Sequence, residues 1–176
     1  MSNANSGARV SSQPAKKTGN VVRDSVLGLV PETVDPYLKL NYQVWHAGPL
    51  NPAELEMIRL RNARKVGCVF CQAVRYDVAT NSGLFEEKIN WINDEFESSA
   101  LSNREKLILR FTDHYLQDPA GLTPEFKSVL ATEFSAEEVS HMSIALMLFN
   151  TFSRCAVALG GMPDHELPLI PMEVPQ

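Results

Sequence analysis

The sequence predicts an all-α fold, a bundle of about six to seven helices. Apolar residues recur at helical spacing, for example Leu107, Ile108, Phe111 and Tyr115. Helix start signals, such as a Ser followed three residues later by a Glu, precede the apolar stretches. No stretch shows a convincing strand pattern. We therefore expect helices packed against helices around one core.

Composition narrows the class of protein. The chain has 176 residues, 44% of them hydrophobic, which suits one domain with its own core. A net charge of −5 provides no basic field that would favour nucleic acid. No apolar run approaches the roughly 20 residues that span a bilayer, and the N-terminus has no secretory h-region. We therefore expect a soluble, cytoplasmic protein that binds neither nucleic acid nor membrane.

The chain is expected to divide into three parts. Residues 1–20 are rich in Ser, Asn, Gly and Lys and should form a disordered tail. Residues 21–165 should form a single helical domain. Residues 166–176 are rich in proline and should form an extended C-terminal tail.

Proline, glycine and asparagine mark the helix ends in the first half of the domain. Pro31 and Pro36 bracket an entry segment, and Gly48, followed by another proline, ends the helix after it. Asn51 is an N-cap candidate with proline next to it, and Gly67 ends the helix that it opens. These signals predict helices at 37–47, 52–66, 68–80 and 85–95.

Two capping boxes mark helix starts in the second half. One pairs Ser102 with Glu105, and the other pairs Ser135 with Glu138. A threonine followed by proline opens a shorter helix between them. These signals predict helices at 103–118, 124–133 and 136–159, the last of which is the most apolar.

The stretch RNARKVGCVFCQAVRYD, residues 61–77, holds two of the three cysteines in a C-x-x-C spacing. Cys68 falls at the N-terminus of an expected helix and Cys71 in its first turn, where free backbone N–H groups favour thiolate. Arg75, one turn further on, shares their face and adds a positive charge. Three cysteines are too few for a disulfide scaffold, and a close pair in a reducing cytosol is more often catalytic or metal-binding.

The preceding helix offers a candidate proton acceptor. On a helical wheel Glu56 shares a face with Leu60, Ala63 and Gly67. A carboxylate among apolar and small residues should be partly buried, so it needs a partner. Burial would favour its protonated form and suit it to proton transfer. The other interpretation is a polar residue at the helix edge, hydrogen-bonded to a neighbour.

Three interpretations of the cysteine pair are open from the residues. A zinc site needs two further ligands, and none of the candidates has a paired knuckle spacing. The other two interpretations are a pair of inert buried thiols and a redox-active dithiol, which the local charges favour. The candidate zinc ligands are Cys155, His46, His114, His141 and His165.

Other conspicuous residues are given structural interpretations. Cys155 lies in the long apolar helix and is interpreted as a buried structural thiol. His114 is interpreted as an interior or surface histidine, and His141, among acidic residues, as an ordinary surface histidine. Trp45 and Trp91 should anchor helices in the core or at a subunit contact.

The stretch ELEMIRLRNARKVGCVFC resembles the alkylhydroperoxidase D-like (AhpD-like) branch of the carboxymuconolactone decarboxylase superfamily. The stretches LSNREKLILRFTDHYL and FSAEEVSHMSIALMLFNTFSRCAVALG are similar to the two following helical segments of that family. The resemblance covers residues 30–161. It implies an AhpD-like helical bundle that assembles as a homo-oligomer, either a dimer, a trimer or a hexamer.

The resemblance also implies a thiol-dependent peroxidase or dithiol oxidoreductase that acts on a small hydroperoxide. By position, Cys71 would attack the peroxide, Cys68 would resolve the product, and Glu56 would accept a proton. No cofactor is implied, because an external dithiol, a lipoyl- or thioredoxin-type protein, would restore the pair. Arg75 occupies the place of the family's relay histidine, and Phe70 the place of a second one. Since arginine stays protonated, Arg75 can support a thiolate or pair with Glu56 but cannot shuttle a proton.

Two alternative functions stay open at this point. The first is a lactone decarboxylase, the other activity of the superfamily, whose chemistry needs no thiol. The second is a non-catalytic helical oligomer whose cysteines sense oxidation or only pack.

Overall fold

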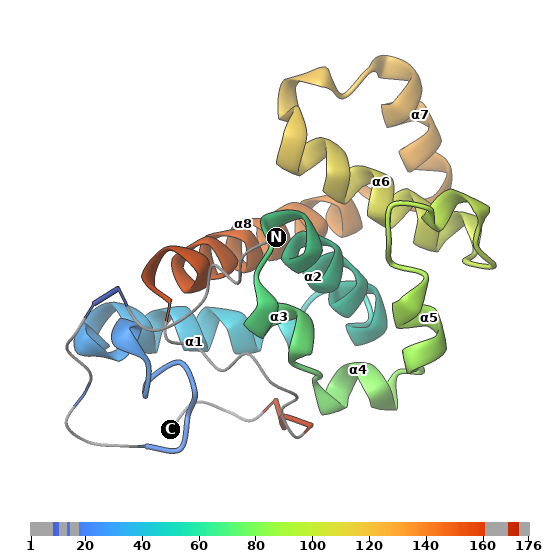
Figure 1. Cartoon of the computed structure of the whole chain (residues 1–176). Coiled ribbons are helices and arrows are strands. Elements are labelled where there is room, and N and C mark those ends of the chain that lie inside the picture. Colours follow the sequence, from blue (N-terminus) through green and yellow to red (C-terminus); the bar gives the residue numbers. More distant parts are fainter. Residues whose placement is uncertain (1–8, 11–13, 15–17, 161–168, 173–176) are drawn as a thin grey trace.

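The computed structural model describes residues 9–10, 14, 18–160 and 169–172. Over these residues the all-α prediction is confirmed, because they form eight α-helices and three short 3-10 helices with no strand (Figure 1). The 3-10 helices are η1 (Val26–Leu29), η2 (Phe96–Ser98) and η3 (Pro119–Gly121). The α-helices are α1 (Pro31–His46), α2 (Pro52–Val66), α3 (Val69–Ala73), α4 (Asp77–Asn81), α5 (Glu86–Asn90), α6 (Asn103–Gln117), α7 (Pro124–Glu133) and α8 (Ala136–Leu159).

Helix α2 is the central element of the fold. It packs against α8 and α6 most extensively and also contacts α1, α3 and α4 (Figure 1). Ten consecutive residues, 54–63, are buried, so this helix is covered on all sides. Its start is fixed by a capping box between Asn51 and Glu54, and its end by Gly67, whose φ of 74° is left-handed. Both ends agree with the sequence prediction.

Because α2 is buried on all sides, its charged residues need partners inside the molecule. Glu54 accepts from Arg104 at 2.6 Å. Arg61 makes a two-pronged contact with Asp113, with its Nε donating to Oδ1 at 2.7 Å. Pairing of this kind makes burial of a charge tolerable. The core is therefore organised by ion pairs as well as by apolar contacts.

Helix α8 is the long apolar helix that the second capping box predicts. It buries Met142, Ala145, Leu146 and Phe149, and it packs against α2 and α1. Among the described helices α8 alone is long and apolar enough to cross a membrane, contrary to the sequence expectation. The core helix of a globular domain passes the same test, and we interpret α8 as such a helix. The cytoplasmic location and the homo-oligomer stay predictions.

Two helices differ in extent from the prediction. Helix α1 begins at Pro31 and not at residue 37, because Pro31 takes the first helical position and Pro36 is accommodated inside the helix. Helix α5 ends at Asn90, whereas the prediction extended it to residue 95. At this end the backbone bonds span three residues, from Trp91 to Lys88 and from Ile92 to Ile89, and the Arg64 guanidinium donates to the carbonyls of Ile89 and Ile92.

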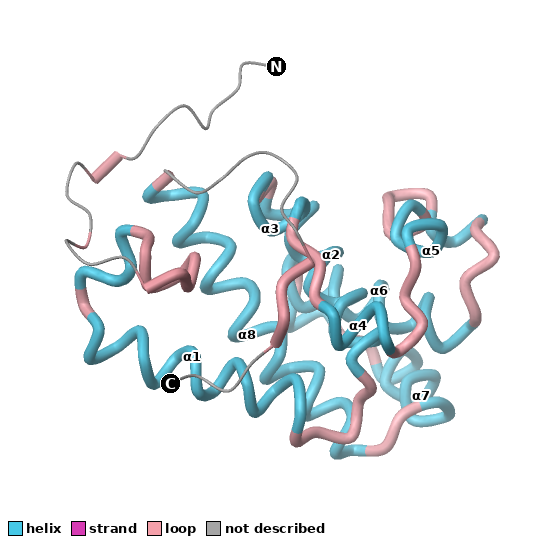
Figure 2. The backbone as a smooth tube through the Cα atoms, turned by 90° about the horizontal axis from the view of Figure 1, so that it is seen from below, coloured by secondary structure: helices cyan, strands magenta, loops and turns pink. Residues whose placement is uncertain are grey.

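The helix predicted at 68–80 is divided into α3 and α4. Arg59 donates to the carbonyls of Cys71 and Val74, so these carbonyls are not used to continue the helix. The chain between the two helices is extended and forms a parallel bridge from Tyr76 to Ile170. Figure 2 shows these two loop segments side by side. This division raises the number of α-helices above the expected six to seven.

Parts of both chain ends contact the helices. In the N-terminal segment, Arg9 donates to the carbonyls of Val157 and Ala158 at the end of α8. Thr18 donates to Asp24. Most of the predicted N-terminal tail, and all but residues 169–172 of the predicted C-terminal one, lie outside the described residues. The extent of the tails stays a prediction.

The interpretation of His141 as a surface residue is wrong, because its side chain is buried under the loop between α1 and α2. Its Nε2 donates to the carbonyl of Val44 at 3.0 Å, and its Nδ1 accepts from the backbone N–H of Leu50 at 3.4 Å. A Cβ at Gly48 would overlap the imidazole ring, so this position needs glycine. Burial lowers the pKa of His141 below its ordinary value of 6.5, although the bond to Val44 opposes the shift.

His141 should therefore make the fold less stable in mild acid. Well above pH 6.5 the ring is neutral in both states, so it contributes no pH dependence there. As the pH falls below this value, His141 is protonated more readily in the unfolded chain than in the folded chain, so the free energy of unfolding declines. We expect His141→Gln to reduce this decline in urea unfolding measured between pH 8 and pH 5. His46→Gln, at an exposed position, is the control, and an equal effect in both variants would contradict the prediction.

Candidate functional site

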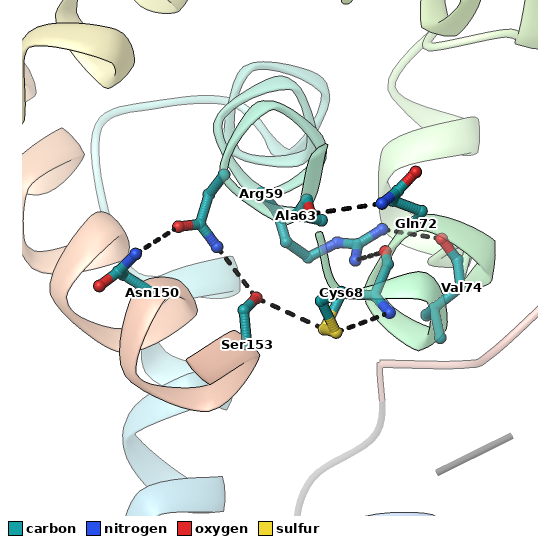
Figure 3. The surroundings of a disulfide bond; sticks show 9 residues. Arg59, Ala63, Cys68, Gln72, Val74, Asn150 and Ser153 are labelled. Atoms are coloured by element: carbon teal, nitrogen blue, oxygen red, sulfur yellow. Dashed lines mark hydrogen bonds between the residues drawn. A yellow bond between two sulfur atoms is a disulfide. The ribbon is translucent and has the colours of Figure 1, made fainter. Parts of the chain in front are cut away.

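The two cysteines lie at the junction of α2 and α3 and form a disulfide (Figure 3). Gly67 turns the chain out of α2, and Cys68 becomes the N-cap of α3. Its sulfur accepts the backbone N–H of Cys71 at 3.2 Å, and the two Cα atoms are 5.3 Å apart. An N–H donor at the sulfur favours a thiolate there after reduction. The exposed fractions of the two residues are 1% and 4%, so the pair is buried.

Glu56 is buried, as the wheel predicts, and its partner is Arg59. Arg59 binds both carboxylate oxygens, with Nε donating to Oε2 at 2.7 Å and Nη2 donating to Oε1 at 2.6 Å. The same guanidinium donates to the carbonyls of Cys71 and Val74 (Figure 3). Burial alone would lower the pKa of Arg59, but the charge and hydrogen bonds of Glu56 hold the pKa above its ordinary value. Arg59 therefore stays charged and ties Glu56 to the backbone around Cys71.

Arg75 does not have the position that the sequence suggested. Its Nε donates to Glu86 at 2.7 Å, and Nη1 donates to the carbonyl of Gln72. The possible pair between Arg75 and Glu56 is not formed, because Arg59 occupies Glu56. Helix α3 ends before Arg75, so the helical face that was expected to carry it beside the cysteines does not continue. Arg59, which sequence reasoning missed, is the cation at the pair, and its spacing of three residues from Glu56 was the available signal.

A small cavity of about 40 Å³ lies against the site. Cys71 lines it and Cys68 does not. The walls are mostly aromatic and aliphatic, with polar groups from Asn41, Arg59, Tyr37, Tyr76 and Ser153. Burial raises the pKa of Tyr76, although the positive charge of Arg59 opposes the shift, and burial raises the pKa of Tyr37. Both hydroxyls therefore keep their protons at neutral pH. The cavity has room for only a few water-sized molecules.

A chain of buried polar side chains reaches Cys71 from α8. Ser153 donates to the Cys71 sulfur at 3.4 Å and accepts from Asn62 at 3.0 Å (Figure 3). Asn150 donates to Asn62 at 2.8 Å. Sequence reasoning missed these residues, because only the fold brings α8 against α2. The only feature of the sequence that could have indicated them is the presence of polar residues, Asn150 and Ser153, in the most apolar helix.

The cysteine pair belongs to a small apolar cluster that is separate from the main core. Val21 and Ile170, from the two ends of the described chain, pack against this cluster. Ile170 is held by backbone hydrogen bonds, from its N–H to the Arg75 carbonyl at 2.9 Å and from the Asp77 N–H to its carbonyl at 3.2 Å. The C-terminal segment 169–172 therefore forms part of the cover over the pair.

If this cover limits access, weakening it should speed reduction of the disulfide. Ile170→Ala removes apolar contact worth about 1–2 kcal/mol. We expect a small dithiol to reduce the pair about tenfold faster, because tenfold in rate corresponds to about 1.4 kcal/mol. Leu169→Ala is the matched control, since this neighbour is exposed. The release of free thiols measures the rate of reduction. Equal rates in the wild type and in Ile170→Ala would show that the segment does not control access.

The other sequence candidates lie away from the pair or lack partners for metal binding. Among the described residues, no group of three or more His, Cys, Asp or Glu side chains could hold a metal ion. Cys155 is a free, half-buried thiol. The His114 ring packs against the Phe126 ring in a tilted arrangement, with 4.7 Å between the ring centroids. Trp45 is in the main core, as expected, and Trp91 packs against it.

Comparison with known proteins gives relatives of undetermined function. No protein-family model matches the chain. The uncharacterized protein Rv2313c of Mycobacterium tuberculosis strain H37Rv is 30% identical over 113 residues, which are 64% of this chain and 39% of that protein. The chain thus spans about two fifths of that relative's length. The uncharacterized protein YdfG of Bacillus subtilis strain 168 is 23% identical over 64% of this chain and 77% of its own length.

A solved structure decides the fold family. ATU0492 from Agrobacterium tumefaciens superposes with a TM-score of 0.64 and 25% sequence identity, over 75% of this chain and 90% of that one. It is a protein of unknown function that has been suggested to be the antioxidant defence protein AhpD. The chain has an AhpD-like fold. This AhpD-like chain carries the C-x-x-C pair of the branch, which confirms the resemblance seen in the sequence.

Proposed function

We propose that this AhpD-like chain is a thiol-dependent peroxidase, or more broadly a dithiol oxidoreductase, that uses Cys71 and Cys68. The observation that carries the proposal is the placement of Cys71. Cys71 lines a small cavity, and its sulfur accepts a hydrogen bond from Ser153 and is bonded to a second cysteine. A peroxidatic thiol needs these three features: substrate access, thiolate stabilisation and a resolving partner.

The proposed cycle has three balanced steps. The Cys71 thiolate attacks one oxygen of a hydroperoxide, the O–O bond breaks, and after protonation the products are a sulfenic acid and an alcohol or water. The Cys68 thiol then attacks the sulfenic sulfur, which forms the observed disulfide and releases water. An external dithiol reduces this disulfide by exchange and is itself oxidised.

Proton transfer in this proposal rests on Glu56. Each Glu56 oxygen accepts one hydrogen bond from Arg59 and keeps a further lone pair, which is free to accept a hydrogen bond from a water molecule. Glu56 is not among the residues that line the cavity, so water would have to carry the proton from Cys71. Arg59 takes the supporting role that the sequence suggested for Arg75.

Consumption of hydrogen peroxide by the pure protein tests the proposal. Hydrogen peroxide is the right substrate, because the cavity holds only a few water-sized molecules. The assay supplies a dithiol donor, in one arm lipoamide-type and in the other thioredoxin-type. We expect turnover that depends on the donor and that is lost after both cysteines are alkylated. Absence of turnover with every donor, or turnover that survives alkylation, would refute the peroxidase.

One observation favours a second candidate, a redox sensor without turnover. The pair is almost completely buried, and Val21 and Ile170 pack against the apolar cluster that contains it. Slow, reversible oxidation that changes the cover would suit a sensor. Reversible disulfide formation in a protein that turns over no peroxide would support this candidate.

A further inference from the structure

The hydroxyl of Ser153 differs from the neighbouring hydroxyls of α8 in what it binds. Ser143 and Thr151 donate to the carbonyl four residues earlier, at 3.0 and 2.7 Å. That bond is the ordinary one for a hydroxyl in a helix. Ser153 instead donates to the Cys71 sulfur at 3.4 Å, and its side chain is fully buried with an exposed fraction of 1%. The hydrogen of this buried hydroxyl is thus committed to a sulfur.

The direction of that hydrogen bond is fixed from the surface. Arg154, which is exposed, donates to Asn150 Oδ1 at 2.9 Å, and a guanidinium has no acceptor. The Asn150 oxygen must therefore face Arg154, and its NH₂ group must face Asn62. The Asn62 NH₂ group then faces Ser153 and occupies a lone pair of the hydroxyl. Only the hydroxyl hydrogen is left for the Cys71 sulfur.

We propose that Ser153 is a catalytic residue of the dithiol site, and that Asn62, Asn150 and Arg154 are positioning residues that orient its hydroxyl. Reduction breaks the bond between the two sulfurs, and Ser153 then donates to the Cys71 thiolate. A donor at a sulfur stabilises its charged form. Amide groups do not pass protons along such a chain, so the two asparagines orient Ser153 and do not relay protons. Ser153 also lines the cavity that Cys71 lines, so its hydroxyl lies at the place where the thiolate would meet the peroxide.

This inference rests on the proposed function, but its test does not need peroxide. In a Cys68→Ser background, the rate of Cys71 alkylation by iodoacetamide is measured from pH 5 to pH 10, with peptide mapping to separate Cys71 from Cys155. A hydrogen bond to a charged group is worth about one to two units on the pH scale. We therefore expect Ser153→Ala to move the alkylation midpoint upward by about one unit. Ser143→Ala, on the same helix, should leave the midpoint unchanged.

A second variant distinguishes the loss of the hydrogen bond to Cys71 from a change in packing caused by Ser153→Ala. Arg154→Glu lies on the surface and replaces a donor with an acceptor, which reverses the orientation of both amides and turns the hydroxyl hydrogen of Ser153 away from the sulfur. We expect an upward shift of the midpoint there as well, with unchanged far-ultraviolet circular dichroism. An unchanged midpoint in Ser153→Ala would overturn the inference, even if the wild type turns over peroxide. A shifted midpoint would support it, even if peroxide turnover is absent.

Discussion

Replacing Cys71 with serine is expected to reduce peroxide turnover by at least roughly 10³-fold, because a hydroxyl cannot replace the attacking thiolate. The prediction concerns Cys71 alone, because the structure favours Cys71 over Cys68 as the cysteine that attacks the peroxide. Cys71 lines the cavity and accepts from Ser153, whereas Cys68 is turned away as the N-cap of α3. The measurement is peroxide consumption in the presence of a dithiol donor.

Cys68→Ser should behave differently and serves as the matched variant. Cys71 can still attack one equivalent of peroxide, but no neighbouring thiol condenses with the sulfenic acid. Without the dithiol donor, whose own thiols would reduce the sulfenic acid, we expect a single rapid turnover and a sulfenic acid on Cys71 that dimedone traps. Cys155→Ser should keep full turnover, because this thiol takes no part in the pair. Trapping of the sulfenic acid on Cys68, in Cys71→Ser, would reverse the order of the cysteines.

Local signals were sufficient for most of the fold. The two Ser–Glu capping boxes, with the Asn51 cap and Gly67, placed the starts of α6 and α8 and both ends of α2. These signals involve residues within one turn of each other, so the sequence contains all the partners. Two of the errors occur where a distant side chain binds backbone carbonyls at the end of a helix. Arg59 binds the carbonyls of Cys71 and Val74 at the end of α3, and Arg64 binds the carbonyls of Ile89 and Ile92 at the end of α5.

The candidate site was predictable to the same degree. Cys68, Cys71 and Glu56 lie within 16 residues, counting both ends, so local spacing made them candidates, and the family resemblance suggested their separate roles. Ser153 lies 82 positions from Cys71, and only the packing of α8 against α2 brings them together. Arg75 was placed wrongly for the same reason that α3 was drawn too long. One tertiary contact, from Arg59 to the carbonyls of Cys71 and Val74, accounts for the early end of α3 and for the position of Arg75 away from the cysteines.

That contact makes Arg59 more than a partner for a carboxylate. Its guanidinium binds Glu56, caps the end of α3 and lies over the Tyr76 ring, with 5.1 Å between its Cζ and the ring centroid. It thereby connects α2 to the segment that pairs with Ile170. The cation that pairs with the proposed proton acceptor therefore also holds the segment that bridges to Ile170.

Removing this cation should therefore have the largest effect on stability of any single change at the site. We expect Arg59→Met to lower the unfolding free energy by about 3–5 kcal/mol, because it leaves the Glu56 carboxylate buried without a partner. The carbonyls of Cys71 and Val74 lose their donor as well. Urea unfolding followed by tryptophan fluorescence measures the change.

Arg75→Met is the matched control, because it also removes an arginine that forms an ion pair with a glutamate. Glu86 is exposed, so water replaces the lost partner, and the expected cost is below about 1 kcal/mol. Adding Glu56→Met to Arg59→Met should recover much of the loss, since no unpaired charge then remains in the interior. Equal costs for Arg59→Met and Arg75→Met would mean that the buried pair does not stabilise the site as argued. Recovery in the double variant would show that the cost lies in the unpaired carboxylate.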